Sequence, residues 1–541
     1  MRNLSRCILW SLIVTFGFTL QANALMLNGT ARDPNGRPIA EAFVTAHSAL
    51  RRSSETVLSD RTGHYVIDNL YPGEYQLRAR KDGFADGIVA NVSVNALAQS
   101  VDVKLQKADP SNPMRPGSAW LAAAPEGPMK TSFITSCTIC HDPGSTMVRG
   151  PRDANGWTAV IQQMRGITSV YGGLFKLDDA AAAKWLADTH FGEHAVPLDL
   201  FAAKAGVVEN AAISEYEVGS LETWAHDMAV DPNTGDAWVV DYVKDQLTRV
   251  DPRSGRQRVF ECPVKGAGMH TLNFDRDGTM WITFQLAGMI GRFDPTNRQW
   301  RLYGGLAPSS LPHSFALDSD GFVKHDSAGR IWFSEFGARA MGGLSPDSGQ
   351  VISIPLPGAN PGRPYGAALD SAGRVWFSNY YDNEIGFIDP KNLQGQRWSM
   401  KRADSGPHRM HIDDEDNLWI PLSGYGLILR HNTRDGSEKE FTLPDPDTFP
   451  YALRFDRRSH RVWIAGNGAN SIYALDPDTG QTRTFRLPSH ISYPRMISID
   501  YATGDVWTAL SSYPNVQTGR DHGMLLRIRD ALDAVRQPAG K

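Results

Sequence analysis

The chain has 541 residues, which is too long for one ordinary hydrophobic core, so we expect several domains. Its 55 basic and 59 acidic side chains leave a formal charge of -4. A charge so balanced provides no basic surface for a nucleic acid, and we exclude nucleic acid as a partner.

The first 24 residues have the pattern of a secretory signal peptide. Arg2 and Arg6 precede an apolar run, and small residues allow cleavage after Ala24. The apolar run is shorter than the roughly 20 residues that span a bilayer, and no later segment is apolar enough to do so. We therefore expect a periplasmic or secreted protein with no membrane span after signal cleavage.

Residues 25 to 107 predict a small β-sandwich. Apolar residues alternate along short segments, which are separated by Asn-Gly and Pro-Gly turns. A turn glycine, the segment Thr62-Gly-His-Tyr65 and the segment Pro72-Gly-Glu-Tyr75 resemble the carboxypeptidase regulatory-like domain. The resemblance implies a scaffold or adhesion module, because this segment assembles no catalytic set.

The composition then changes twice. Prolines recur between residues 108 and 130, which predicts a linker. Beyond it, apolar residues recur at helical spacing over residues 156 to 164 and 178 to 187, and Asp178 suits a helix N-terminus. We predict a small α-helical domain over residues 131 to 196.

A Cys-x-x-Cys-His motif lies in this helical segment, at Cys137, Cys140 and His141. The two thiols are spaced to form thioethers with the vinyl groups of haem, and the histidine is placed as the proximal iron ligand. The alternatives are a redox disulfide or half of a zinc site. The sequence has neither a second Cys-x-x-Cys nor a thioredoxin-like βαβ pattern. We expect covalently bound haem c.

The segment resembles small class I cytochromes c, in which a methionine supplies the sixth iron ligand. This resemblance implies Met164 as that ligand, because it ends the predicted helix, with Met147 as the alternative. Methionine ligation raises the reduction potential and suits electron transfer to a periplasmic redox partner.

The rest of the chain repeats. Seven tryptophans recur at intervals of about 43 or 44 residues, with one longer interval of about 51, and an aspartate precedes each one. A period of about 40 to 45 residues with several short strands per unit is typical of propeller blades. The tryptophans are Trp238, Trp281, Trp332, Trp376, Trp419, Trp463 and Trp507, and the aspartates are Asp231, Asp275, Asp318, Asp370, Asp413, Asp456 and Asp500.

The sequence therefore predicts a mainly β protein with a seven-bladed β-propeller over residues 211 to 530. The last unit ends near Arg529 after three strands. Residues 211 to 219 resemble the outer strands of other units, so we expect them to complete blade seven. Such a closure leaves no long unpaired strand edge.

Counting back five residues from each of these aspartates identifies one equivalent residue in every blade. This position lies at the entry to the innermost strand, so we expect its side chains to meet at the mouth of the central channel. Four imidazoles in register favour a functional site over four separate structural roles. Imidazole suits zinc, copper or iron, or serves as a base near neutral pH. The seven residues are His226, His270, His313, Tyr365, His408, Tyr451 and Arg495.

Two segments of the third blade, Leu311-Pro-His-Ser-Phe-Ala-Leu-Asp318 and Ile331-Trp-Phe-Ser-Glu335, resemble the streptogramin B (virginiamycin B) lyases. These are seven-bladed propellers that open a cyclic depsipeptide ester by magnesium-assisted elimination. The resemblance covers residues 211 to 530. It implies His313 as the catalytic base, Glu335 as a magnesium ligand and His270 as a substrate-binding residue.

The third blade also departs from that family. The family has a second metal carboxylate two residues before the catalytic histidine, where this chain has Leu311, and residues 321 to 327 are inserted after Asp318. Magnesium prefers oxygen ligands, so the additional histidines favour a softer transition metal. The predicted metal ligands are His226, His270, His313, His408 and Glu335.

Three functions of different classes follow. The first is a haem c oxidoreductase or electron-transfer protein with a second metal ion, or a small-molecule substrate, at the channel mouth. The second is a lyase similar to the streptogramin enzymes, in which magnesium is the metal. The third is a non-catalytic periplasmic binding protein. Propellers host all three, so fold alone does not choose among them.

Overall fold

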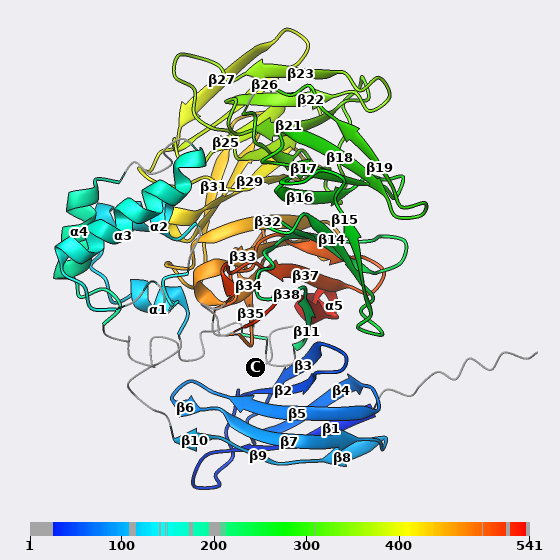
Figure 1. Cartoon of the computed structure of the whole chain (residues 1–541). Helices are drawn as coiled ribbons and strands as arrows, with labels where there is room; N and C mark the ends of the chain where they lie inside the picture. Colours follow the sequence, from blue (N-terminus) through cyan, green and yellow to red (C-terminus); the bar gives the residue numbers. More distant parts are fainter. Residues whose placement is uncertain are drawn as a thin grey trace, which may run out of the picture.

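The computed structural model describes residues 25–107, 115–139, 142–145, 148, 150–171, 177–193, 207–208, 211–307, 309–489, 491–515 and 520–536. The predicted signal peptide lies outside these residues, as do Cys140, His141 and Met147. The described chain is mainly β, as predicted, with a group of helices beside the larger β region (Figure 1).

The first ten strands form a β-sandwich-like region. One sheet has the order β4-β1-β8, with β9 also paired to β1, and the other contains β3, β2, β5 and β7. Every second side chain of β5 is buried, as expected for a strand with one face on a core that contains Leu27, Tyr65 and Leu77. The strands are β1 Leu25–Arg32, β2 Phe43–Ser48, β3 Ser53–Leu58, β4 His64–Leu70, β5 Gly73–Arg80, β6 Phe84–Ala85, β7 Gly87–Val94, β8 Ala98–Ser100, β9 Val103–Lys104 and β10 Gln106–Lys107.

This sandwich joins the second β region through backbone pairing. β3 pairs antiparallel with β11 (Ala212–Val218), and the other edge of β11 pairs with β38 (Gly523–Arg529). The pairing of β11 with the last strand is the one expected for residues 211 to 219. The pairing with β3 was not predicted. It produces one eight-stranded sheet, β36-β37-β38-β11-β3-β2-β5-β7, that runs through both regions (Figure 1).

The helices lie between the two β regions in the sequence. They are α1 Gly117–Leu121, α2 Pro128–Cys137, α3 Ala154–Ile167, the 3₁₀ turn η1 Thr168–Tyr171 and α4 Asp179–Asp188, and α5 Ala531–Arg536 follows the last strand. α3 and α4 match the two predicted helices. The Asp178 carboxylate caps α4 by accepting from the Ala181 N–H at 2.7 Å. Within the described residues, no helix is long and apolar enough to cross a membrane.

Part of the predicted linker is helical. α1 and the first residues of α2 fall inside residues 108 to 130, where the proline content had indicated an irregular segment. Pro116 is the N-cap of α1, and Pro128 is the first residue of α2. Proline is tolerated at these positions because the first helical N–H groups have no intrahelical partner. The prolines therefore mark helix starts.

The second β region consists of four-stranded antiparallel units and is propeller-like. Six units follow one another in the chain, and a seventh combines β36, β37 and β38 with β11. Their strands are β12 Ala225–Val230, β13 Ala237–Asp241, β14 Gln246–Val250, β15 Gln257–Glu261; β16 Met269–Phe274, β17 Met280–Phe284, β18 Met289–Asp294, β19 Gln299–Tyr303; β20 Pro312–Phe315, β21 Ile331–Glu335, β22 Ala340–Leu344, β23 Val351–Pro355; β24 Gly366–Leu369, β25 Val375–Asn379, β26 Glu384–Asp389, β27 Gln394–Ser399; β28 His411–Ile412, β29 Asn417–Leu422, β30 Leu427–Asn432, β31 Glu438–Thr442; β32 Pro450–Asp456, β33 Arg461–Gly466, β34 Ser471–Leu475, β35 Thr482–Arg486; β36 Ser498–Asp500 and β37 Asp505–Leu510.

The repeated tryptophans lie on the second strand of each unit and are fully buried. In four units the indole N–H donates to an aspartate six residues earlier, at 2.8 to 2.9 Å. In the third unit that aspartate is Asp326 instead of the predicted Asp318, because the inserted residues add a second aspartate turn. In the other three units the aspartate is seven residues earlier, and the indole nitrogen has no partner among the described residues.

We expect the Trp376–Asp370 hydrogen bond to contribute measurably to stability. The indole nitrogen donates to the Asp370 carboxylate at 2.8 Å, and both side chains are buried. Asp370→Ala should lower the free energy of unfolding by about 1–3 kcal/mol, because it leaves a buried donor unpaired. Asp370 also binds Arg374, so the measurement is a double-mutant cycle with Trp376→Phe by urea unfolding. Additive effects of the two substitutions would contradict the prediction.

Candidate functional site

The seven predicted channel residues meet in one closed ring, which we call the His-Tyr ring. Successive aromatic rings, from His226 through His270, His313, Tyr365 and His408 to Tyr451, have centroids 4.0 to 4.5 Å apart. Arg495 closes the ring, because its guanidinium contacts His226 Nε2 and donates to Tyr451 Oη at 3.0 Å. The sequence prediction that these positions converge is confirmed.

Backbone irregularity places these side chains at the channel. In β12, β16, β20 and β32 the pairing register with the second strand shifts at the ring position. Such a bulge re-aims a side chain within an otherwise regular strand. In blades four, five and seven, the ring residue lies one to three residues before the start of the innermost strand.

Burial keeps the imidazoles of the ring uncharged. It lowers the pKa of His226 to about 4, with help from the Arg495 charge. The pKa values of His270, His313 and His408 are also well below the usual range, first because of burial and then because of neighbouring positive charges. Burial likewise raises the pKa of Tyr365. The ring is therefore a set of neutral hydrogen-bonding groups around one guanidinium.

The four histidines differ in their hydrogen bonds. His226 Nδ1 lies 2.9 Å from the His270 carbonyl oxygen, and its Nε2 faces Arg495. His313 Nδ1 lies 3.0 Å from Ser314 Oγ, and His270 Nδ1 lies 3.0 Å from Thr271 Oγ1. No side chain among the described residues pairs with either nitrogen of His408. Both nitrogens of His226 are thus occupied, whereas those of His408 are open to other side chains.

An ion pair spans the channel one position further along the strands. Arg409 Nη1 donates to Asp227 Oδ2 at 2.6 Å, and Arg409 Nη2 lies 3.4 Å from Thr271 Oγ1. Burial disfavours the charge on Asp227, but the charges and hydrogen bonds of Arg409 and His226 together outweigh it and lower the pKa to about 2. Sequence analysis missed this pair. The position four residues before each aspartate would have revealed it, since it holds opposite charges in blades one and five.

The transition-metal site predicted at the histidines finds no support in the described chain. No three His, Cys, Asp or Glu side chains there are grouped to hold a metal ion. Glu335 is buried, and its carboxylate accepts from Ser353 on β23. Burial raises the Glu335 pKa, and the hydrogen bond from Ser353 partly offsets this effect. The predicted ligand roles of Glu335 and the histidines remain predictions.

The Cys-x-x-Cys segment packs on the His-Tyr ring. The Thr138 carbonyl oxygen accepts from Tyr493 Oη at 2.7 Å, and Tyr493 in turn packs against two ring residues, Tyr451 and Arg495. Ile139 lies in an apolar cluster with a third ring residue, Tyr365. Thr138 therefore reaches the ring through Tyr493, and Ile139 shares an apolar cluster with the ring residue Tyr365.

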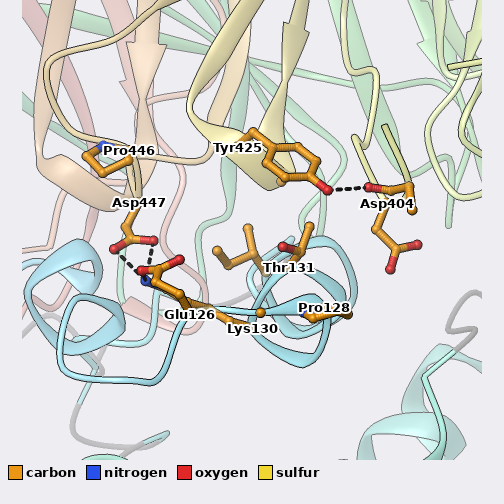
Figure 2. A pocket seen from close by; sticks show the side chains of 12 residues that line it. Glu126, Pro128, Lys130, Thr131, Asp404, Tyr425, Pro446 and Asp447 are labelled. Atoms are coloured by element: carbon orange, nitrogen blue, oxygen red, sulfur yellow. Dashed lines mark hydrogen bonds and ion pairs between the residues drawn. The ribbon is translucent and has the colours of Figure 1, made fainter. Parts of the chain in front are cut away.

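α2 is held on this face by polar contacts and close packing. The Lys130 ammonium lies 2.9 Å from the Asp447 carboxylate, and Ser132 donates to Asp404. α2 also packs on the turn η3 (Ser423–Tyr425), where a Cβ at Gly424 would approach Thr131 to 3.0 Å. Figure 2 shows the adjoining pocket of about 350 Å³, between α2 and the propeller loops.

Of the predicted haem residues, the structure describes Cys137 and Met164. Cys137 is half-buried at the end of α2. Met164 is half-buried and lies within α3, three residues before its end, where the sequence had placed the end of the helix. Cys137 contacts an apolar cluster that joins the helices to the propeller through Phe449 and Tyr493.

Comparisons with known proteins agree with the two β regions. The virginiamycin B lyase family matches residues 203–431, and the carboxypeptidase regulatory-like domain matches residues 26–106. A solved streptogramin B lyase is 22% identical with a TM-score of 0.50, and the alignment covers 59% of this chain and 97% of that chain. A catalytically inactive virginiamycin B lyase from Staphylococcus aureus, solved with quinupristin, has the same identity and TM-score and is covered to 98%. The search of curated proteins found no match. The larger β region is therefore similar in fold to the streptogramin B lyases, and the N-terminal region resembles a carboxypeptidase regulatory-like domain.

Proposed function

We propose that this chain is an exported c-type haem protein that carries out oxidoreduction or electron transfer where the Cys-x-x-Cys segment meets the His-Tyr ring. The observation that supports the proposal is the packing of Thr138 and Ile139 on the ring. Because these two residues lie between the cysteines, a haem bound through both thiols would be adjacent to the propeller channel.

The surroundings of Cys137 fit such a group. The cluster beside it includes the aromatic residues Phe133, Trp157 and Phe191. Apolar aromatic side chains suit a macrocycle. Cys137 and Cys140 would hold the haem, His141 would bind its iron, and Met164 is the proposed sixth ligand. When bound, the haem supplies one-electron chemistry.

The residues of the ring would handle protons and orient the substrate. His313 has one hydrogen bond among the described residues, at Nδ1, so Nε2 can accept a proton from a substrate hydroxyl. The Arg495 guanidinium can orient a polar or anionic group. His226, which has both nitrogens engaged, acts as a positioning residue for Arg495. Ile139 and Tyr365 exclude water from the ring.

The haem proposal is tested with the full chain exported from a host that matures c-type cytochromes. We expect a sharp reduced c-type α-band and haem that stays bound after denaturation. The double variant Cys137→Ala/Cys140→Ala should abolish covalent haem, because it removes both thioethers. Cys262→Ala is the matched control, since Cys262 is a buried free cysteine in a different core cluster. Haem-free wild-type protein from this host would refute the proposal.

A lyase is the second candidate, and the family match over residues 203–431 favours it. His313 stands at the family's catalytic-base position, and its Nδ1 contact with Ser314 leaves Nε2 to accept a proton. Two features count against it, namely Leu311 at the position of a metal carboxylate and the Ser353 contact of Glu335. Magnesium-dependent opening of a cyclic depsipeptide ester by the Cys137→Ala variant, lost in Cys137→Ala/His313→Ala, would support this alternative.

A further inference from the structure

A second pocket lies at the opposite end of the innermost strands from the His-Tyr ring. Ring residues lie at the starts of these strands, whereas this pocket is lined by residues at their ends and by the inserted loop of blade three. We call it the Arg454 pocket. Its volume is about 70 Å³, and its lining includes Asn273, Gly321, Phe322, Arg454, Ser498 and Tyr501.

Three polar atoms of this pocket lack a hydrogen-bond partner in the described chain. They are Asn273 Oδ1, Arg454 Nε and Tyr501 Oη. Asn273 is 3% exposed and Arg454 is 5% exposed, so bulk water does not solvate them freely. Buried polar groups are ordinarily paired, and three unpaired groups around one cavity indicate a missing ligand.

Arg454 also lacks a carboxylate partner among the described residues. The Asp320 carboxylate is bound by Arg276 and Arg457, at 3.0 Å each. Arg454 instead donates from Nη1 to the Asp320 carbonyl oxygen at 3.4 Å. Asp500 also lines the pocket, and its carboxylate accepts from the Ala502 N–H. Burial lowers the pKa of Arg454, and the nearby Asp318 and Asp320 carboxylates only partly offset this, so the unpaired guanidinium favours a bound anion.

The inserted loop is shaped around this guanidinium. Gly321 begins the inserted residues 321 to 327 and has a φ of +88°. A Cβ built at Gly321 would lie 1.1 Å from Arg454 Nη1. Only glycine therefore allows the guanidinium to lie against the loop backbone. The segment that distinguishes blade three from the other blades thus forms the wall of the pocket.

We propose that the Arg454 pocket binds a small hydroxycarboxylate of two or three carbon atoms. A carboxylate can accept from Arg454 Nε and Tyr501 Oη, and an adjacent hydroxyl can donate to Asn273 Oδ1. One water needs roughly 10–15 Å³ on this measure, so the cavity admits about five or six non-hydrogen atoms. Glycolate and lactate have this size and these groups.

The test is glycolate binding to the full chain by isothermal titration calorimetry. We expect saturable binding to wild type and at least about tenfold weaker binding to Arg454→Met, which keeps the length of the side chain but removes the charge. Arg301→Met is the matched control, because Arg301 is exposed on β19 and outside the pocket. Acetate, which lacks the hydroxyl, should bind more weakly than glycolate.

Tyr501→Phe keeps the test decisive if Arg454→Met does not fold, because it removes one hydroxyl and conserves the ring. We expect it to weaken glycolate binding several-fold. No saturable heat with wild type, or equal affinity in wild type, Arg454→Met and Tyr501→Phe, would overturn the proposal and leave a pocket filled by water. The haem proposal is tested separately, since Cys137→Ala should bind glycolate as wild type does.

Discussion

Arg409→Met should lower the free energy of unfolding by about 3–5 kcal/mol, because it leaves the Asp227 carboxylate buried without its partner. Asp227 is 0% exposed and Arg409 is 4% exposed, so water cannot replace the lost contact. Urea unfolding followed by tryptophan fluorescence measures the effect.

Two further variants test whether the loss of stability comes from the broken ion pair or from any substitution of a charged residue. Arg409→Met/Asp227→Leu removes both charges and should recover most of the lost stability, since apolar pairs of similar volume often replace buried ion pairs. Lys184→Met removes an exposed pair with Asp188 on α4 and should cost no more than about 0.5 kcal/mol. A cost below about 1 kcal/mol for Arg409→Met would contradict the expectation.

Acidification between pH 6.5 and pH 4 should destabilise the folded protein steeply. The folded ring holds its histidines neutral, and the pKa of His226 is lowered from 6.5 to about 4. Below pH 6.5 the unfolded chain takes up protons that the folded ring does not, so stability falls as pH falls. His226 alone contributes on the order of 3 kcal/mol over this interval. Urea unfolding at several pH values measures the slope.

Variants that remove one titrating group test whether the ring causes the loss of stability at low pH. The slope of the free energy of unfolding against pH gives the number of protons taken up on unfolding. His408→Phe should lower this number by up to one, because the pKa of His408 is also well lowered and no side chain in the described chain pairs with its ring nitrogens. His64→Gln, which removes an exposed imidazole of the sandwich, is the control outside the ring. Equal slopes in wild type and His408→Phe would assign the acid sensitivity to groups outside the ring.

Much of the β architecture could be predicted because it repeats. Each unit samples the same positions, so the tryptophan spacing reveals the units, and the position five residues before each aspartate reveals the His-Tyr ring. The same alignment of the blades also identifies residues that we did not predict. One residue after the ring position stand Asp227 and Arg409, and three residues after it stand Asn273 and Arg454. Neither position keeps one residue type through all seven blades, so no single blade shows a pattern.

Local chemistry determined the helices and the turns. Asp178 caps α4, and residues with helical spacing form α3 and α4 as predicted. The same local rules failed for the linker, because proline marks both irregular segments and helix starts. They did not indicate which aspartate binds the Trp332 indole, since Asp318 and Asp326 both begin turns that end in glycine and only packing decides which one the indole reaches.

The sequence by itself determined the repeat units, the convergence of seven ring positions and the Cys-x-x-Cys-His motif. Only the tertiary structure decided that β3 extends the last propeller sheet, that Thr138 and Ile139 pack on the ring, and that Arg409 pairs with Asp227 across the channel. The physical reason is distance along the chain. Strand periodicity and capping act between residues a few positions apart, whereas these contacts join segments separated by more than a hundred residues and depend on how whole domains dock.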